Sequence, residues 1–98
     1  MILVRNVFQL KFGKMKEAMT LWKDAESVLR SVGHSPNRIT TDLSGQFYTL
    51  VIENTYDSLT AYDKANSEMG GSKEWSNWYQ KFTPLVEVGR REIYSIVG

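Results

Sequence analysis

Apolar side chains occupy every second position in the first segment of the chain. In Ile2–Leu10, one face carries Ile2, Val4, Phe8 and Leu10, with Asn6 among them. A repeat of two residues is typical of a β-strand, because successive side chains point to opposite faces of a sheet. The other face also carries apolar side chains, Leu3 and Val7. We therefore predict a strand over residues 2–10 that is covered on both faces.

The next segment has a helical repeat. Between residues 14 and 32, apolar side chains recur every three or four positions, at Met15, Ala18, Met19, Trp22, Ala25, Val28 or Leu29, and Val32. This spacing predicts a long amphipathic helix. Gly13 precedes the helix, and Gly33 followed by Pro36 supplies its stop. Glu26 and Arg30 are spaced for an ion pair on its outer side.

Three further segments alternate like strands. Residues 37–43 and 46–54 flank a short turn that contains Gly45, and they predict an antiparallel hairpin. Residues 85–97 predict the last strand, with a bulge or bend at Gly89.

Two helices are expected between the hairpin and the last strand. Thr55 is placed to cap the first of them, which Gly70 and Gly71 end. Ser72 is placed to cap the second, and Pro84 stops it.

The order of these elements predicts a single α+β domain over residues 1–98. With the two helices after the hairpin counted as one helical connection, the order is strand, helix, strand, strand, helix, strand. This is the ferredoxin-like βαββαβ arrangement, with a four-stranded antiparallel sheet. One layer of helices covers only one face of such a sheet, yet the strands are apolar on both faces. A second copy packed sheet on sheet is the simplest cover, so we expect a homodimer through the sheet face.

Composition excludes several classes of protein. The chain has 98 residues, no Cys and one His, which leaves no disulfide, no thiolate nucleophile and no Cys/His metal site, so no metal is expected. The net charge of +1 gives no footprint for nucleic acid. No run of about 20 apolar residues could span a membrane, and the first residues lack a secretion signal. A cytoplasmic protein with neither nucleic-acid nor membrane partners is expected.

Three short segments carry a family resemblance. They are Phe12-Gly13-Lys14, Tyr56-Asp57-Ser58-Leu59, and Trp75-Ser76-Asn77-Trp78 followed by Pro84-Leu85. With the order of elements, they resemble the dimeric α+β barrel superfamily, and NIPSNAP-like proteins within it. The resemblance implies a ferredoxin-like protomer, a dimer, and a cleft between helices and sheet. Relatives include antibiotic-biosynthesis-type monooxygenases that need no bound cofactor, and enzymes that degrade haem.

The resemblance argues against haem. Haem-degrading relatives use an Asn on the first strand, a Trp on the second helix and a His shortly beyond it. Asn6 matches the first position, but Tyr62 stands at the Trp position and residues 69–72 contain no His. We therefore expect neither haem binding nor any other cofactor.

Four residues are candidates for binding a ligand: Asn6, Tyr62, Trp75 and Trp78. Asn6 interrupts an apolar row, so it needs either a structural partner such as Tyr62 or water, or a ligand. Trp75 and Trp78 belong to an aromatic stripe with helical spacing, which suits core packing as well as stacking on a flat substrate. His34 lies in a loop without a recognisable partner, which favours a solvated side chain.

These observations favour a small NIPSNAP-like dimer that binds a small apolar or aromatic molecule in the cleft. Asn6, Tyr62 and one of Trp75 or Trp78 would border that cleft. One alternative is a cofactor-independent monooxygenase, in which Asn6 and an aromatic side chain orient an electron-rich substrate. The other is a structural or assembly module without a ligand.

Overall fold

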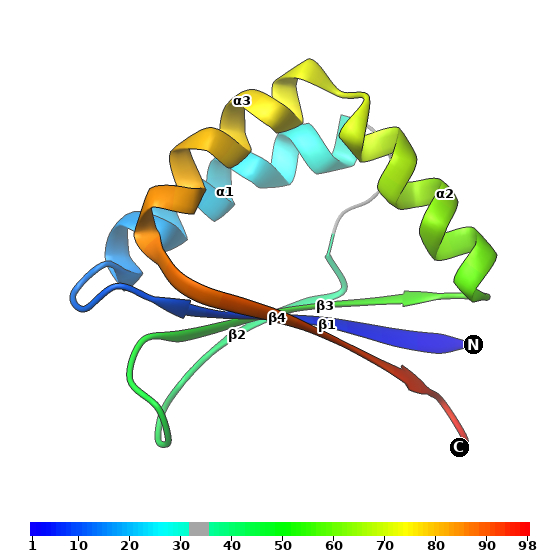
Figure 1. The fold of residues 1–98 in the computed structure, drawn as a ribbon, viewed down its shortest axis with the longest axis horizontal. Coiled ribbons are helices and arrows are strands. Elements are labelled where there is room, and N and C mark those ends of the chain that lie inside the picture. Colours follow the sequence, from blue (N-terminus) through cyan, green and yellow to red (C-terminus); the bar gives the residue numbers. More distant parts are fainter. Residues whose placement is uncertain (32–35) are drawn as a thin grey trace.

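The computed structural model describes residues 1–31 and 36–98. Its strands are β1 (Ile2–Leu10), β2 (Arg38–Thr41), β3 (Thr49–Tyr56) and β4 (Val86–Ser95). Its helices are α1 (Met15–Ser31), α2 (Leu59–Gly70) and α3 (Lys73–Phe82), followed by the short 3-10 helix η1 (Thr83–Leu85). The strands form one antiparallel sheet in the order β2-β3-β1-β4, and the three helices lie on one face of it (Figure 1). This is the predicted ferredoxin-like α+β fold.

The core lies between α1, α3 and the sheet. The Trp22 ring of α1 packs edge-on against Trp78 of α3 at 4.7 Å and against Phe82 at 5.6 Å between centroids. Phe82 in turn meets the edge of Phe8 from the sheet at 5.0 Å. The Trp78 indole N–H donates a hydrogen bond of 2.6 Å to the carbonyl of Leu21. Ring packing and this bond fix α3 against α1.

Helix α2 is packed less closely than the other two. Ala65 is its one buried residue, whereas α1 buries four residues, Ala18, Trp22, Ala25 and Leu29. A helix with so little buried surface contributes few apolar contacts to the core. No helix in the described part of the chain is long and apolar enough to span a bilayer.

The caps of the later helices confirm one prediction and correct another. Ser72 caps α3, since its side chain accepts a hydrogen bond from the Trp75 N–H at 3.2 Å. The cap of α2 is Ser58, which accepts from the Ala61 N–H at 3.1 Å, so the prediction that Thr55 caps this helix is wrong. Thr55 stays in β3, and its N–H donates to the Asn37 side chain at 2.6 Å.

Gly89 does not form the predicted bulge. The register of β1 and β4 shifts between Gln9 and Leu10, opposite Val88 and Val86, so Glu87 is the extra residue. Gly89 pairs regularly with Phe8, and a Cβ built on it would lie 3.2 Å from the Phe8 ring. A glycine is therefore favoured here because a side chain would crowd the Phe8 ring, and not because the strand bends.

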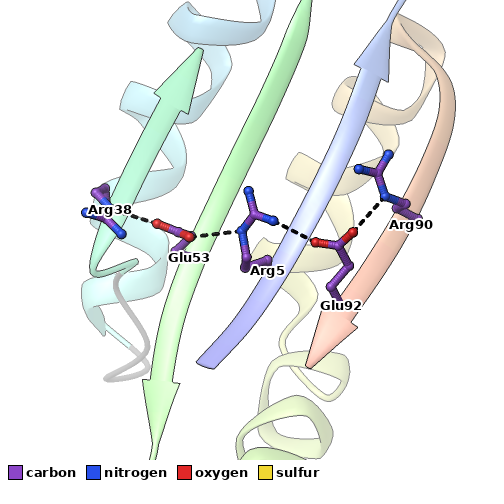
Figure 2. A network of polar contacts seen from close by, with 5 residues as sticks. All are labelled: Arg5, Arg38, Glu53, Arg90 and Glu92. Carbon is purple, nitrogen blue, oxygen red and sulfur yellow. Dashed lines mark hydrogen bonds and ion pairs between the residues drawn. The ribbon is translucent and has the colours of Figure 1, made fainter. Parts of the chain in front are cut away.

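The sheet face away from the helices carries charges as well as apolar side chains. Figure 2 shows five side chains linked across the four strands, in the order Arg38, Glu53, Arg5, Glu92 and Arg90. The sequence predicted an apolar face, and Leu3 and Val7 do lie on it, beside this row. We call the five residues the charge ladder. Its signs alternate, so each carboxylate lies between two guanidinium groups.

Candidate functional site

A cavity of about 530 Å³ lies between the helices and the sheet. Its floor includes Val4, Asn6, Phe8, Ile52, Asn54, Tyr56 and Arg91 from the strands. Its walls include Trp22 of α1, Tyr62, Asn66 and Met69 of α2, and Trp75 and Tyr79 of α3. The lining combines apolar and aromatic side chains with several polar groups, and the volume lies in the usual range for sites that bind small molecules.

Strand pairing brings the polar groups of the floor together. Asn6 of β1 lies directly opposite Arg91 of β4, and its side-chain oxygen accepts a hydrogen bond from the Arg91 Nε at 3.0 Å. The same guanidinium lies 5.6 Å from the centre of the Tyr62 ring, a cation–π distance. Two strands and α2 thus converge on one group of three side chains.

Two polar atoms in residues that line the cavity are buried and have no hydrogen-bond partner among the described residues. They are the Tyr62 hydroxyl and the Trp22 indole nitrogen, and both residues line the cavity. Leaving such an atom unsatisfied costs about 1–3 kcal/mol, so native proteins rarely do so without a reason. A ligand in the cavity could supply the missing partners.

Tyr56 adds a neutral hydroxyl to the site. Burial raises the pKa of Tyr56, the nearby Tyr62 raises this pKa further, and Arg91 opposes them. The Tyr56 and Tyr62 rings contact each other at 5.2 Å in an edge arrangement. Tyr56 is therefore protonated at neutral pH and can donate a hydrogen bond.

The charge of the cavity is positive. Arg90 and Arg91 are the charged residues among those that line it in the described part of the chain. The Arg90 side chain is directed to the opposite face of the sheet, where its Nε lies 3.1 Å from Glu92 (Figure 2). Arg91 is then the one side-chain charge that the described lining residues turn toward the cavity. No group of three or more described His, Cys, Asp and Glu side chains could hold a metal.

The structure brings three of the four candidate residues together. Asn6, Tyr62 and Trp75 line the cavity. Trp78 does not line it: the residue is 5% exposed, stacks on Phe82 at 5.3 Å, and belongs to the core. His34 lies outside the described residues.

Arg91 is not among the four candidates predicted from the sequence. The paired Arg90 and Arg91 suit an anionic substrate, but such charges more often form a solvated rim, and their residue type does not tell one from the other. One signal could have separated them, because adjacent residues of a strand face opposite sides of the sheet. One of the pair therefore had to share a face with the predicted cleft.

Comparison with solved structures shows the same fold. An uncharacterised NIPSNAP domain protein from Burkholderia xenovorans matches with a TM-score of 0.90 at 14% identity, over 99% of this chain and 95% of that one. A NIPSNAP family protein from Agrobacterium tumefaciens matches with a TM-score of 0.87 at 16% identity, over 98% and 85%. A putative antibiotic biosynthesis monooxygenase from Nitrosomonas europaea matches with a TM-score of 0.75 at 12% identity, over the full length of both chains.

Sequence comparison assigns the family. No curated protein matches the chain. The NIPSNAP family model matches residues 5–97, which is nearly the whole chain. This protein therefore belongs to the NIPSNAP family.

Proposed function

We propose that this protein binds a small aromatic or apolar molecule in the cavity between its helices and its sheet. The observation that carries the proposal is the buried Tyr62 hydroxyl, which has no hydrogen-bond partner among residues 1–31 and 36–98, in the wall of a cavity of about 530 Å³. Aromatic side chains form much of the surrounding wall and suit a flat ring. A ligand with a hydrogen-bond acceptor would satisfy the hydroxyl on binding.

Tyr62→Phe tests this proposal. The variant removes a hydroxyl that has no described partner, so the free protein should keep its thermal stability or gain slightly. Affinity for a ligand that accepts this hydrogen bond should fall about fivefold or more. A screen of small aromatic, quinol and acyl compounds would use thermal shift and Trp fluorescence, to which Trp22 and Trp75 in the cavity wall respond.

Tyr94→Phe is the matched control. Tyr94 lies on the opposite sheet face and is 49% exposed, so its loss should leave binding unchanged. If no compound shifts the wild type, the structural or assembly module without a ligand becomes the better interpretation. Equal affinity of both variants and the wild type for every hit would show that Tyr62 does not contact the ligand.

Catalysis as a cofactor-independent monooxygenase is the second candidate function. It is favoured by the structural similarity to the putative antibiotic biosynthesis monooxygenase from Nitrosomonas europaea, which shares the fold. In this proposal, Asn6 and Arg91 would orient an electron-rich phenol, which would itself reduce dioxygen: one oxygen atom would enter the ring to give a quinone, and the other would leave as water with two hydrogens of the substrate. An oxygen electrode would test it with each phenol that binds. Oxygen uptake above the uncatalysed rate is expected, and Asn6→Leu should remove it.

We also propose a homodimer formed through the sheet face that carries the charge ladder. Val88 lies on this face and is 62% exposed. A second copy related by two-fold symmetry would bring the same alternating row of charges, so that positive groups of one protomer could face negative groups of the other. Two copies would then cover the face that the helices leave open.

Val88→Lys tests the dimer without disturbing the protomer. Lysine at this exposed position should weaken the dimer, because a charge would be buried in the interface. Leu59→Lys is the matched control, since Leu59 is 60% exposed but lies at the start of α2. Sedimentation at micromolar concentration should show dimers for the wild type and the control. A wild-type monomer at all concentrations would contradict the proposal.

A further inference from the structure

We propose that the ligand of the cavity is an aromatic carboxylate, held at its negative end by Arg91. This inference rests on the proposed function and goes beyond it by naming the ligand's charge and chemical class. The evidence for it is the set of ion pairs that the arginines of this chain form.

Arg91 differs from every other arginine in the chain. The others are Arg5, Arg30, Arg38 and Arg90, and each forms an ion pair with a glutamate at 2.6–3.1 Å. No ion pair between described residues involves Arg91. The strand alternation explains the difference, because Glu92 and Arg90 lie together on the ladder face (Figure 2). The Arg91 guanidinium therefore has no counter-ion among the described residues.

The contacts of Arg91 hold it in place while its terminal nitrogens stay available. Its Nε donates to the Asn6 oxygen at 3.0 Å, and the guanidinium lies 5.6 Å from the Tyr62 ring centre. Neither contact uses the N–H groups of the two Nη nitrogens. A planar guanidinium offers a fork of donors that matches the two oxygens of a carboxylate. Arg91 is exposed, so it lies where a ligand can reach it from solvent.

The other residues of the cavity indicate which chemical group the carboxylate of the ligand should be attached to. The described lining residues include no Asp or Glu that would repel an anion. Trp75, Tyr79 and Phe8 offer ring faces and edges to an aromatic body. A cationic ligand would be repelled by Arg91, and a neutral one would leave its charge without a partner. An aromatic carboxylate could pair its charged group with Arg91 and pack its ring against these aromatic side chains.

The test compares 2-naphthoate with 2-naphthamide, which has nearly the same shape and no charge. Isothermal titration with the wild type should show naphthoate binding about tenfold or more tightly than naphthamide, as expected for charge-assisted hydrogen bonds. Arg91→Gln should remove this preference while naphthamide still binds. Arg30→Gln is the matched control: it removes the same charge from an exposed arginine of α1 that does not line the cavity, and the preference should persist.

Two outcomes would overturn the inference. The first is equal affinity of the wild type for both compounds, or tighter binding of naphthamide, which would leave the proposed function standing. The second is an unchanged preference in Arg91→Gln, with its fold checked by thermal melting, which would place the anion elsewhere. Binding of neither compound would contradict the anion proposal and count against the proposed function as well.

Discussion

Glu53 is the residue on which the charge ladder depends most. Its two carboxylate oxygens accept hydrogen bonds from the Nε of Arg38 at 2.6 Å and the Nε of Arg5 at 3.0 Å. The side chain is 10% exposed, and the Arg38 hydrogen bond, with Arg5, lowers the pKa of the Glu53 carboxyl. We therefore expect Glu53→Gln to destabilise the protein.

The size of the effect follows from what the amide loses. Glutamine keeps the shape of glutamate, but one oxygen becomes an NH₂ group that faces an arginine N–H, and the negative charge between two cations is gone. A hydrogen bond to a charged group contributes about 1.5–3 kcal/mol when water is excluded. Here the neighbouring side chains cover Glu53, but no second layer of the protomer does, so solvent screens the charges. We expect a loss of about 1–2 kcal/mol in the free energy of unfolding.

Urea unfolding of the wild type, Glu53→Gln and Glu26→Gln would measure this loss. Glu26 is the control, because it pairs with Arg30 on the exposed side of α1, where such pairs contribute about 0.3–0.5 kcal/mol. A carboxylate with a lowered folded pKa stabilises the protein above its unfolded pKa and loses this effect as the pH falls through the folded value. The gap between wild type and Glu53→Gln should therefore shrink below the usual pKa of 4.5. Equal losses in the two variants, or a gap that widens in acid, would refute the reasoning.

Further predictions concern packing and haem. Gly89→Val should cost about 1–3 kcal/mol in urea unfolding, because even a Cβ would lie 3.2 Å from the Phe8 ring; unchanged stability would contradict the role given to Gly89. Trp78→Phe should cost about 2–3 kcal/mol by the same assay, because it removes the 2.6 Å hydrogen bond to the Leu21 carbonyl and leaves a void in the core. Titration with haemin should give no sharp Soret band; a stoichiometric complex would contradict the expectation drawn from the family pattern.

The elements of the fold could be predicted because each is encoded locally. The alternation over residues 2–10 matches β1 (Ile2–Leu10) at both ends, and the helical repeat over 14–32 contains α1 (Met15–Ser31). Caps were harder, because Thr55 and Ser58 both have a side-chain oxygen that can cap. The choice depended on β3, which keeps Thr55 in the strand by pairing it with Leu3. The pairing of β3 with β1, which cannot be read from the local sequence, therefore determines that Ser58 and not Thr55 caps the helix.

The site was harder to predict because its contacts join distant parts of the chain. Asn6 and Arg91 are 85 residues apart, and they meet only through the register of β1 with β4. Trp75 and Trp78 lie one helical turn apart, so spacing alone could not separate wall from core. Trp78 belongs to the core because it packs against α1, where its indole N–H donates to the Leu21 carbonyl.

The position of Arg91 connects the two faces of the sheet. On the ladder face, Glu92 lies between Arg5 and Arg90 and accepts hydrogen bonds from both. The hydrogen bond from Arg90, and to a smaller extent a hydrogen bond from Tyr94 and the charges of Arg90 and Arg5, lower the pKa of Glu92, which keeps this carboxyl ionised on its own face. Neighbouring residues of a strand point to opposite sides of the sheet. Glu92, which follows Arg91 in the sequence, therefore lies in the charge ladder and not in the cavity. Strand β4 thus places Arg90 and Glu92 in the charge ladder on one face and Arg91, which has no described counter-ion, on the cavity face. A carboxylate on the cavity side of β4 could pair with Arg91. Because strand alternation places Glu92 on the other face, an anionic ligand is the expected partner of Arg91.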